Sequence, residues 1–253
     1  MRTPFIVGNW KMNLTLHEVE EFLDAVKGSL PDPKDVECAI AASSIYMDVL
    51  TRFCKEETNL KTAAQNCFYK DSGAYTGEVS PMALADMGVN YVMLGHSERR
   101  KYFGETNKMI NKKVKAVLAN NMVPIICCDE TMAKRKTYDE MNWVVNPVIE
   151  ALKGISEDDA KKIVIGYEPS WAIGTGKSAS GAEIQEACFL IRETLKDLYG
   201  DDIANQIRIV YGGSVNARNV SEIMSQDDVD GVLPGKSSLN AKEFIKIVNY
   251  QNN

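Results

Sequence analysis

Short apolar runs alternate with longer amphipathic segments along the whole chain. The short runs show little apolar–polar alternation, which is typical of strands that are covered on both faces. They predict eight strands, at residues 5–10, 36–41, 60–65, 91–95, 123–127, 163–167, 207–211 and 231–233.

The longer segments carry apolar residues at helical spacing. Thr15 and Glu18 form a capping box ahead of Val19, Phe22 and Val26, which predicts a helix start. An apolar stripe predicts another helix over 184–195. Further helices are predicted at 45–56, 107–119, 138–152, 217–224 and 241–248, with a shorter one at 81–87.

Eight strands, each followed by helical sequence, fit into 253 residues with no linker or low-complexity tract between them. This number of βα units in this length is typical of a closed (β/α)8 barrel. An open doubly wound sheet is the alternative, and the count of eight favours the barrel. We therefore expect an α/β fold with one TIM-barrel catalytic domain over 1–253.

The charge and the cysteine content of the chain disfavour some classes of function. The formal charge of −6 is unlike the basic stripe of a nucleic-acid-binding protein, so an anionic substrate needs a local positive site. The six cysteines are scattered without a Cys-x-x-Cys pair, which favours reduced, buried thiols in a cytoplasmic protein. Neither a signal peptide nor an apolar run long enough to span a membrane is expected.

Chemically capable residues recur where the predicted strands end. In such a barrel, active groups lie at the C-terminal ends of the strands. The groups that follow strands one, four, six, seven and eight are Asn9 with Lys11, His96 with Glu98, Glu168, Gly212-Gly213-Ser214 and Gly235-Lys236-Ser237.

Together these groups fit proton abstraction beside a carbonyl on a small phosphorylated substrate, without a cofactor or metal. Glu168 can act as the base while His96 polarises an oxygen. Glycine-rich turns that open helices present N–H groups to a phosphate, and Lys11 adds a positive charge. Each residue alone has a plainer interpretation, such as a solvated surface lysine or a histidine that opens a helix.

Two nucleotide-binding patterns fail. Gly176-Lys177-Ser178 resembles the end of a P-loop, but Trp171 occupies the position of the required first glycine. Gly235-Lys236-Ser237 fails likewise, because Asp230 stands at that position. A dinucleotide site lacks the G-x-G-x-x-G pattern.

Longer motifs carry a resemblance to a known family. The chain closely resembles the triosephosphate isomerases over essentially its full length. The matching stretches are Gly8-Asn9-Trp10-Lys11, Ala64-Gln65-Asn66, Gly73-Ala74-Tyr75-Thr76-Gly77-Glu78, Gly95-His96-Ser97-Glu98-Arg99-Arg100, Tyr167-Glu168-Pro169 and Tyr211-Gly212-Gly213-Ser214-Val215.

The resemblance implies interconversion of dihydroxyacetone phosphate and D-glyceraldehyde 3-phosphate through an enediolate, a step of glycolysis and gluconeogenesis. By the same resemblance, Glu168 is the base and His96 the neutral electrophile, whose pKa in this family is lowered by a helix N-terminus. Asn9 and Lys11 would stabilise the enediolate and hold the substrate, and Glu98 matches a further functional acid. The N–H groups expected to bind the phosphate are those of Gly174, Ser214, Gly235 and Lys236.

The resemblance also implies a lid that closes over the substrate. Pro169, Ser170 and Trp171 would form the first hinge, with Lys177 in the second hinge. Residues 172–176 would be the moving tip, which contains Gly174 and Gly176. Tyr211 and Ser214 match residues that latch the closed lid. The 73–78 loop resembles the family's dimer contact, so a homodimer is expected with Thr76 reaching the partner's site.

Some positions depart from the family pattern. Lys236 stands where a second glycine is usual, Pro234 where valine is frequent and Asp129 where glycine is common. The N–H of Lys236 remains, so we expect an unchanged reaction class and a changed phosphate affinity.

Two rival functions stay open at this point. One is an aldolase of the same fold that uses Lys11 or Lys236 as a Schiff-base amine. The other is a non-catalytic sensor of sugar phosphates, which the intact set of Lys11, His96 and Glu168 disfavours.

Overall fold

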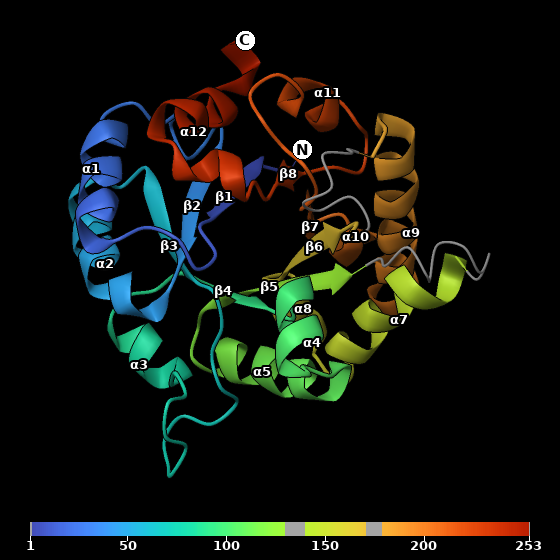
Figure 1. Cartoon of the computed structure of the whole chain (residues 1–253). Coiled ribbons are helices and arrows are strands. Elements are labelled where there is room, and N and C mark those ends of the chain that lie inside the picture. The colour runs from blue at the N-terminus through green and yellow to red at the C-terminus, as the bar shows by residue number, and fades with distance from the viewer. Residues whose placement is uncertain (1, 130–139, 171–178, 253) are drawn as a thin grey trace.

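The computed structural model describes residues 2–129, 140–170 and 179–252. Within them, eight parallel strands close into a barrel in chain order, with β1 hydrogen-bonded to β8. Helices surround the strands, as Figure 1 shows. The predicted barrel is confirmed. The strands are β1 (Phe5–Asn9), β2 (Glu37–Ala42), β3 (Leu60–Ala64), β4 (Tyr91–Leu94), β5 (Val123–Asp129), β6 (Val164–Glu168), β7 (Arg208–Tyr211) and β8 (Gly231–Val232).

Each predicted helical segment contains a helix. The helices are α1 (Leu16–Val26), α2 (Met47–Glu56), α3 (Pro81–Asp86), α4 (Ser97–Phe103), α5 (Asn107–Ala119), α7 (Glu140–Leu152), α8 (Glu157–Ala160), α9 (Gly181–Tyr199), α10 (Asp201–Ala204), α11 (Val220–Met224) and α12 (Ala241–Val248). Of these, α4, α8 and α10 were not predicted as helices. Residues 138 and 139 of the predicted 138–152 helix lie outside the described residues. Short 3-10 turns are η1 (Ser44–Tyr46), η2 (Lys236–Leu239) and η3 (Tyr250–Asn252).

Two helix starts are stabilised by capping boxes, one of which the sequence predicted. Thr15 accepts a hydrogen bond from the N–H of Glu18, whose side chain returns to the Thr15 N–H, so the predicted capping box is present. Ser180 and Glu183 form a second capping box at the start of α9. Each box satisfies N–H groups that a helix start would otherwise leave without partners.

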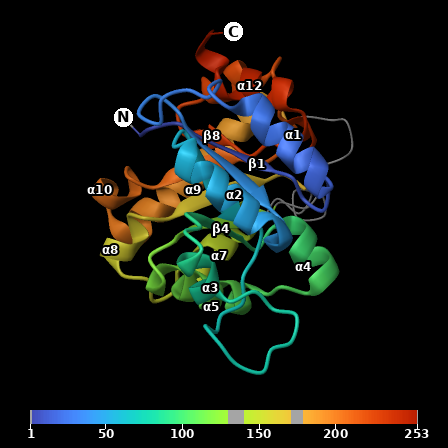
Figure 2. The same cartoon turned by 90° about the vertical axis from the view of Figure 1, so that its left-hand side faces the viewer.

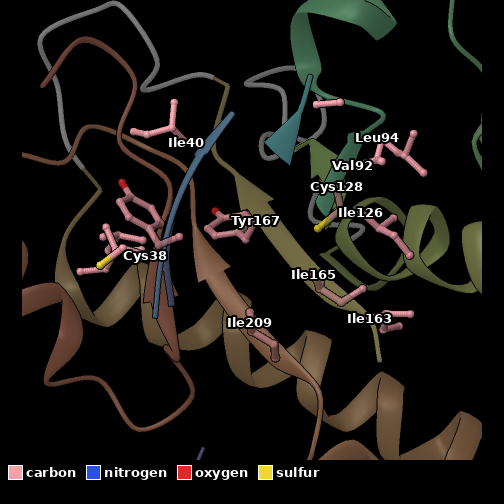
Figure 3. Packing of buried hydrophobic residues seen from close by; sticks show 14 of the residues in the cluster. Cys38, Ile40, Val92, Leu94, Ile126, Cys128, Ile163, Ile165, Tyr167 and Ile209 are labelled. Carbon is pink, nitrogen blue, oxygen red and sulfur yellow. The ribbon is translucent and has the colours of Figure 1, made fainter. Parts of the chain in front are cut away.

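Strand side chains divide into two apolar layers. One buried cluster fills the barrel and includes Phe5 and Val7 of β1 and Val164 of β6. The other lies between the barrel and its helices; Figure 3 shows part of it, including Ile126 of β5 and Ile165 of β6. Because successive side chains of a strand point to opposite faces, the residue two positions beyond each inward residue also faces inward.

All six cysteines are free thiols. Five of them are buried, as the sequence predicted, and Cys54 is half-buried. Burial raises the pKa of Cys54, Cys67 and Cys128 to about 12. A thiol reacts as its thiolate, so these three are weak nucleophiles at neutral pH.

Candidate active site

Glu168 reaches the mouth of the barrel because it is the last residue of β6. It lies two positions beyond Gly166 and four beyond the inward-facing Val164, so it shares their side of the strand. Its side chain is fully buried, and Oε2 accepts a hydrogen bond of 2.8 Å from the N–H of Ser97. The candidate base is thus held in place by the start of α4.

His96 is the N-cap residue of α4, and its backbone (φ −49°, ψ 143°) is non-helical, as a cap requires. Its Nδ1 accepts a hydrogen bond of 3.3 Å from the Glu98 N–H, and its Nε2 lies 2.8 Å from Glu168 Oε1. A ring nitrogen that accepts a hydrogen bond carries no proton. This geometry therefore fits a neutral ring with its proton on Nε2, aimed at the carboxylate.

Two opposing effects act on the pKa of His96. Burial is the largest single effect and lowers this pKa. The charge and hydrogen bonding of the Glu168 carboxylate, together with the charge of Glu98, raise it, so that the pKa of His96 in the free site lies above the ordinary value. The larger raising effect depends on the negative charge of Glu168. When Glu168 takes up a proton, burial, the nearby Lys11 charge and the N–H groups of the α4 start still favour a neutral ring, against the smaller raising effect of Glu98.

Lys11 and Asn9 meet His96 at the same mouth. Lys11 Nζ lies 2.7 Å from Glu98 Oε1, and the Lys11 N–H donates to Asn9 Oδ1 over 3.0 Å. Lys11 has a backbone φ of +52°, which is rare for a residue with a side chain. Strained backbone of this kind is frequent at functional sites, where surrounding contacts hold it.

The glycine-rich turns complete a cavity of about 640 Å³. Asn9, Lys11 and His96 line it together with the Gly212-Gly213-Ser214 turn and the Gly235-Lys236-Ser237 turn. A hydrogen bond of 2.7 Å from Ser237 Oγ to the Val215 carbonyl joins the two turns. The N–H groups of Gly213, Gly235 and Lys236 have no acceptor among the described residues. Such free N–H groups are what a phosphate requires.

Comparison with known proteins agrees with this geometry. The family model described as triosephosphate isomerase matches residues 4–251. The curated relative "Triosephosphate isomerase" of Pediococcus pentosaceus is 53% identical over 251 residues, covering 99% of this chain and 100% of the relative. The chain belongs to the triosephosphate isomerase family. Relatives with the same name from Lactobacillus acidophilus and Lactiplantibacillus plantarum are 51% and 49% identical, each covering at least 99% of both chains.

The structure brings most of the predicted site residues together. Asn9, Lys11, His96, Ser214, Gly235 and Lys236 line the cavity, and Glu98 contacts Lys11. Glu168 lies behind His96 and is not one of the lining residues. The Lys236 backbone has no positive φ, so lysine fits there without the strain that would demand glycine. Asp129 ends β5 as the register partner of Glu168.

Several predicted lid residues lie outside the described part of the chain, namely Trp171, Gly174, Gly176 and Lys177. Pro169 is buried directly after β6. Tyr211 is fully buried, and burial raises its pKa to about 12 against the lowering effect of backbone groups at Ala179 and Ser214. Its hydroxyl thus lies near the residues that follow the lid segment.

Two residues support the site and were given no role from the sequence. Gln65 Nε2 donates to the carbonyls of Lys11 and Ala41, over 2.9 and 3.0 Å, and so holds the strained Lys11 backbone. Arg100 donates to the carbonyls of Gly95 and Cys127, which ties the ends of β4 and β5 together. Both stand within motifs that resemble the family, and that position is the signal that could have found them.

Proposed function

We propose that this site interconverts dihydroxyacetone phosphate and D-glyceraldehyde 3-phosphate, with Glu168 as the base and His96 as the electrophile. Glu168 takes a proton from the carbon beside the carbonyl, and the C–H electrons form the C=C bond of an enediolate. The protonated Glu168 then returns the proton to the neighbouring carbon, where the C=C electrons form the new C–H bond. The hydrogen on the hydroxyl oxygen of the first carbon passes to the other oxygen, so that the carbonyl now stands on the first carbon. The observation that carries this proposal is the 2.8 Å approach of Glu168 Oε1 to His96 Nε2 beside a cavity with free N–H groups.

His96 suits the electrophile role because its proton lies on Nε2. A neutral imidazole can donate a hydrogen bond from Nε2–H to the developing oxyanion. Protonation of Glu168 removes the larger of the two negative charges that raise the pKa of His96, which favours a neutral ring when the enediolate forms. The ammonium of Lys11 contributes positive charge at the same mouth.

Glu168 has to move before it can act on a substrate in the cavity. Its carboxylate is fully buried and is hydrogen-bonded to the Ser97 N–H. We expect the side chain to leave this N–H and turn toward the cavity when a triose phosphate binds. This movement breaks the hydrogen bond of Oε2 to Ser97 and also gives up the 2.8 Å contact of Oε1 with His96 Nε2.

The aldolase alternative fits this geometry poorly. A Schiff base requires an uncharged amine, whereas Lys11 forms an ion pair with Glu98. Lys236 is exposed, and among the described residues nothing in the lining of the cavity surrounds its amine with apolar groups that would favour the uncharged form. Borohydride trapping with dihydroxyacetone phosphate tests this alternative, and we expect no covalent adduct.

A coupled isomerase assay on the purified protein tests the proposed function. We expect turnover of D-glyceraldehyde 3-phosphate without added cofactor, and a loss of about a hundredfold or more in kcat for His96→Gln, because one donor to the oxyanion is displaced. Wild-type protein that folds and binds phosphate but does not isomerise would instead favour a sugar-phosphate sensor.

We also propose that residues 1–253 act as one catalytic domain in a homodimer. The 73–78 loop projects from the molecule in Figure 2, and Thr76 on it is exposed. A second cavity of about 400 Å³ adjoins Lys11 and His96, and Met12 and Phe103, which are 96% and 67% exposed, line it. This cavity can receive the loop of a partner chain.

Sedimentation of Thr76→Arg tests the dimer. We expect this variant to shift toward monomer and to lose activity, because a charge is forced into the interface. Glu186→Arg, an exposed change on α9, is the control and should remain dimeric. A monomeric wild-type protein would contradict the proposal.

We propose a cytoplasmic location, which fits the free cysteines and the glycolytic reaction. Among the described residues, no helix has the length and apolar character needed to cross a membrane. Fractionation of cells that express the protein would test the location.

A further inference from the structure

Lys236 is a cation of the cavity whose side chain has no assigned task. It is exposed, it is the first residue of η2, and it lines the same cavity as Lys11. The N–H of Lys236 can serve the phosphate whatever side chain stands there. The ammonium group is therefore a separate feature of this chain.

The two lysines of the cavity differ in their pairing. Lys11 is 2.7 Å from Glu98 Oε1, so a carboxylate already offsets much of its charge. Lys236 has no carboxylate within ion-pair distance among the described residues. The described lining of the cavity also contains no aspartate or glutamate. The unbalanced positive charge of the cavity thus comes from Lys236.

The chain as a whole repels the substrate class that the site requires. Its formal charge is −6, and a triose phosphate is a dianion near neutral pH. A local cation at the mouth of a cavity raises the concentration and the association rate of an anion against such a field. Lys236 lines this cavity together with Gly213 and Gly235, whose N–H groups have no acceptor among the described residues.

We propose that the Lys236 ammonium binds the substrate phosphate and, through its unpaired charge, raises the affinity and association rate for phosphate dianions. This inference rests on the proposed function for the identity of the substrate. The side chain is long and flexible, so it can follow the phosphate while the N–H groups fix its position. Lys236 acts in binding and has no part in the proton transfer.

The test uses three full-length variants. Lys236→Met removes the charge and keeps both the backbone N–H and a similar chain length, whereas Lys236→Arg keeps the charge. Lys242→Met is the matched control, because Lys242 is exposed on α12 and does not line the cavity. Lys236→Met and Lys242→Met change the net charge by the same amount.

The first measurement is titration calorimetry with inorganic phosphate at two ionic strengths. We expect Lys236→Met to weaken phosphate binding about fivefold at low salt and to reduce its salt dependence, as loss of one partly exposed charge should. Lys236→Arg and Lys242→Met should stay within about twofold of the wild type. Unchanged binding in Lys236→Met, or an equal loss in Lys242→Met, would overturn the inference.

The second measurement is steady-state kinetics. We expect Lys236→Met to raise KM about fivefold while kcat changes less than about twofold, because uniform binding is lost without loss of transition-state contacts. A fall in kcat with KM unchanged would contradict a binding role. Calorimetry does not depend on turnover, so an inactive wild type would refute the proposed function without deciding the role of Lys236.

Discussion

Buried charges lie at both ends of the barrel, but they are satisfied differently. At the N-terminal end, Asp230 accepts hydrogen bonds from Arg192 and from the Ile209 N–H, and it pairs with Arg2 as well. At the C-terminal end, Glu168 Oε2 accepts a hydrogen bond from the Ser97 N–H. Its second oxygen lies 2.8 Å from His96 Nε2 and accepts no well-formed hydrogen bond from a described residue. A carboxylate whose oxygens both accept hydrogen bonds is held in place, whereas a carboxylate with one oxygen that lacks such a bond can use this oxygen for chemistry.

This difference indicates that the N-terminal end of the barrel contributes to stability, whereas the C-terminal end carries the reactive groups. Arg192 also donates to the carbonyls of Ala204 and Ile207, so it joins the residues before β7 to the start of β8. A second cluster links the first residues of three strands, with Glu37 accepting from Tyr91 and Arg208. Such networks close the floor of the barrel, and loops at the other end are free to carry the site.

The largest effect is expected at the floor. Arg192→Met should lower the free energy of unfolding by about 3–5 kcal/mol, because it leaves Asp230 buried beside fewer partners. Urea unfolding measures the loss, and kcat per folded molecule should not change. Arg52→Met is the control, since its pair with Asp48 is exposed, and it should cost less than about 1 kcal/mol. If the two variants lost the same free energy of unfolding, burial would not be what makes the Arg192 contacts more stabilising than the Arg52 pair.

The next effect concerns the base. Glu168→Asp shortens the side chain by about 1 Å and should lower kcat about a hundredfold, since the carboxylate no longer reaches the substrate carbon. Stopped-flow or coupled assays measure this loss, while the melting temperature should change little.

Glu37→Asp applies the same shortening at the floor and serves as the control. It should reduce stability and leave kcat of the folded enzyme within about twofold, because Glu37 lies far from the site. If Glu168→Asp stays within a few-fold of the wild type, the base is wrongly assigned.

The strands could be predicted from the sequence because each is a short apolar run that the barrel buries on both faces. The rule that strand ends carry the chemistry then placed Asn9, His96 and Glu168 at one mouth, although they are far apart in the chain. Strand ends shifted by one or two residues. The β1 prediction of 5–10, for example, became Phe5–Asn9.

Other features could not be read from local pattern. The four-residue helices α8 and α10 are too short to show an apolar period, and the sequence indicated only one full helix where α4 and α5 both follow β4. The contacts of Arg208 with Glu37 and Tyr91 join residues more than 100 positions apart. Pairings of this kind depend on closure of the barrel, which no local window contains.

The smallest effect concerns a glycine beside the base. A Cβ on Gly212 would lie 3.1 Å from Glu168 Cγ and 3.3 Å from the Tyr167 carbonyl, tighter than ordinary van der Waals contact. Gly212→Ala should therefore displace Glu168 by a few tenths of an ångström and lower kcat up to about tenfold, since catalytic geometry tolerates little misplacement. Gly181→Ala, where the nearest atom belongs to the flexible side chain of Gln226, should leave kcat unchanged. If both alanine variants kept the wild-type kcat, the Glu168 side chain would be able to shift away from the added methyl group and still reach the substrate. The two ends of the barrel would then differ in the mobility of their carboxylates, because the fully bonded Asp230 cannot shift in this way, and not in the exact position of Glu168.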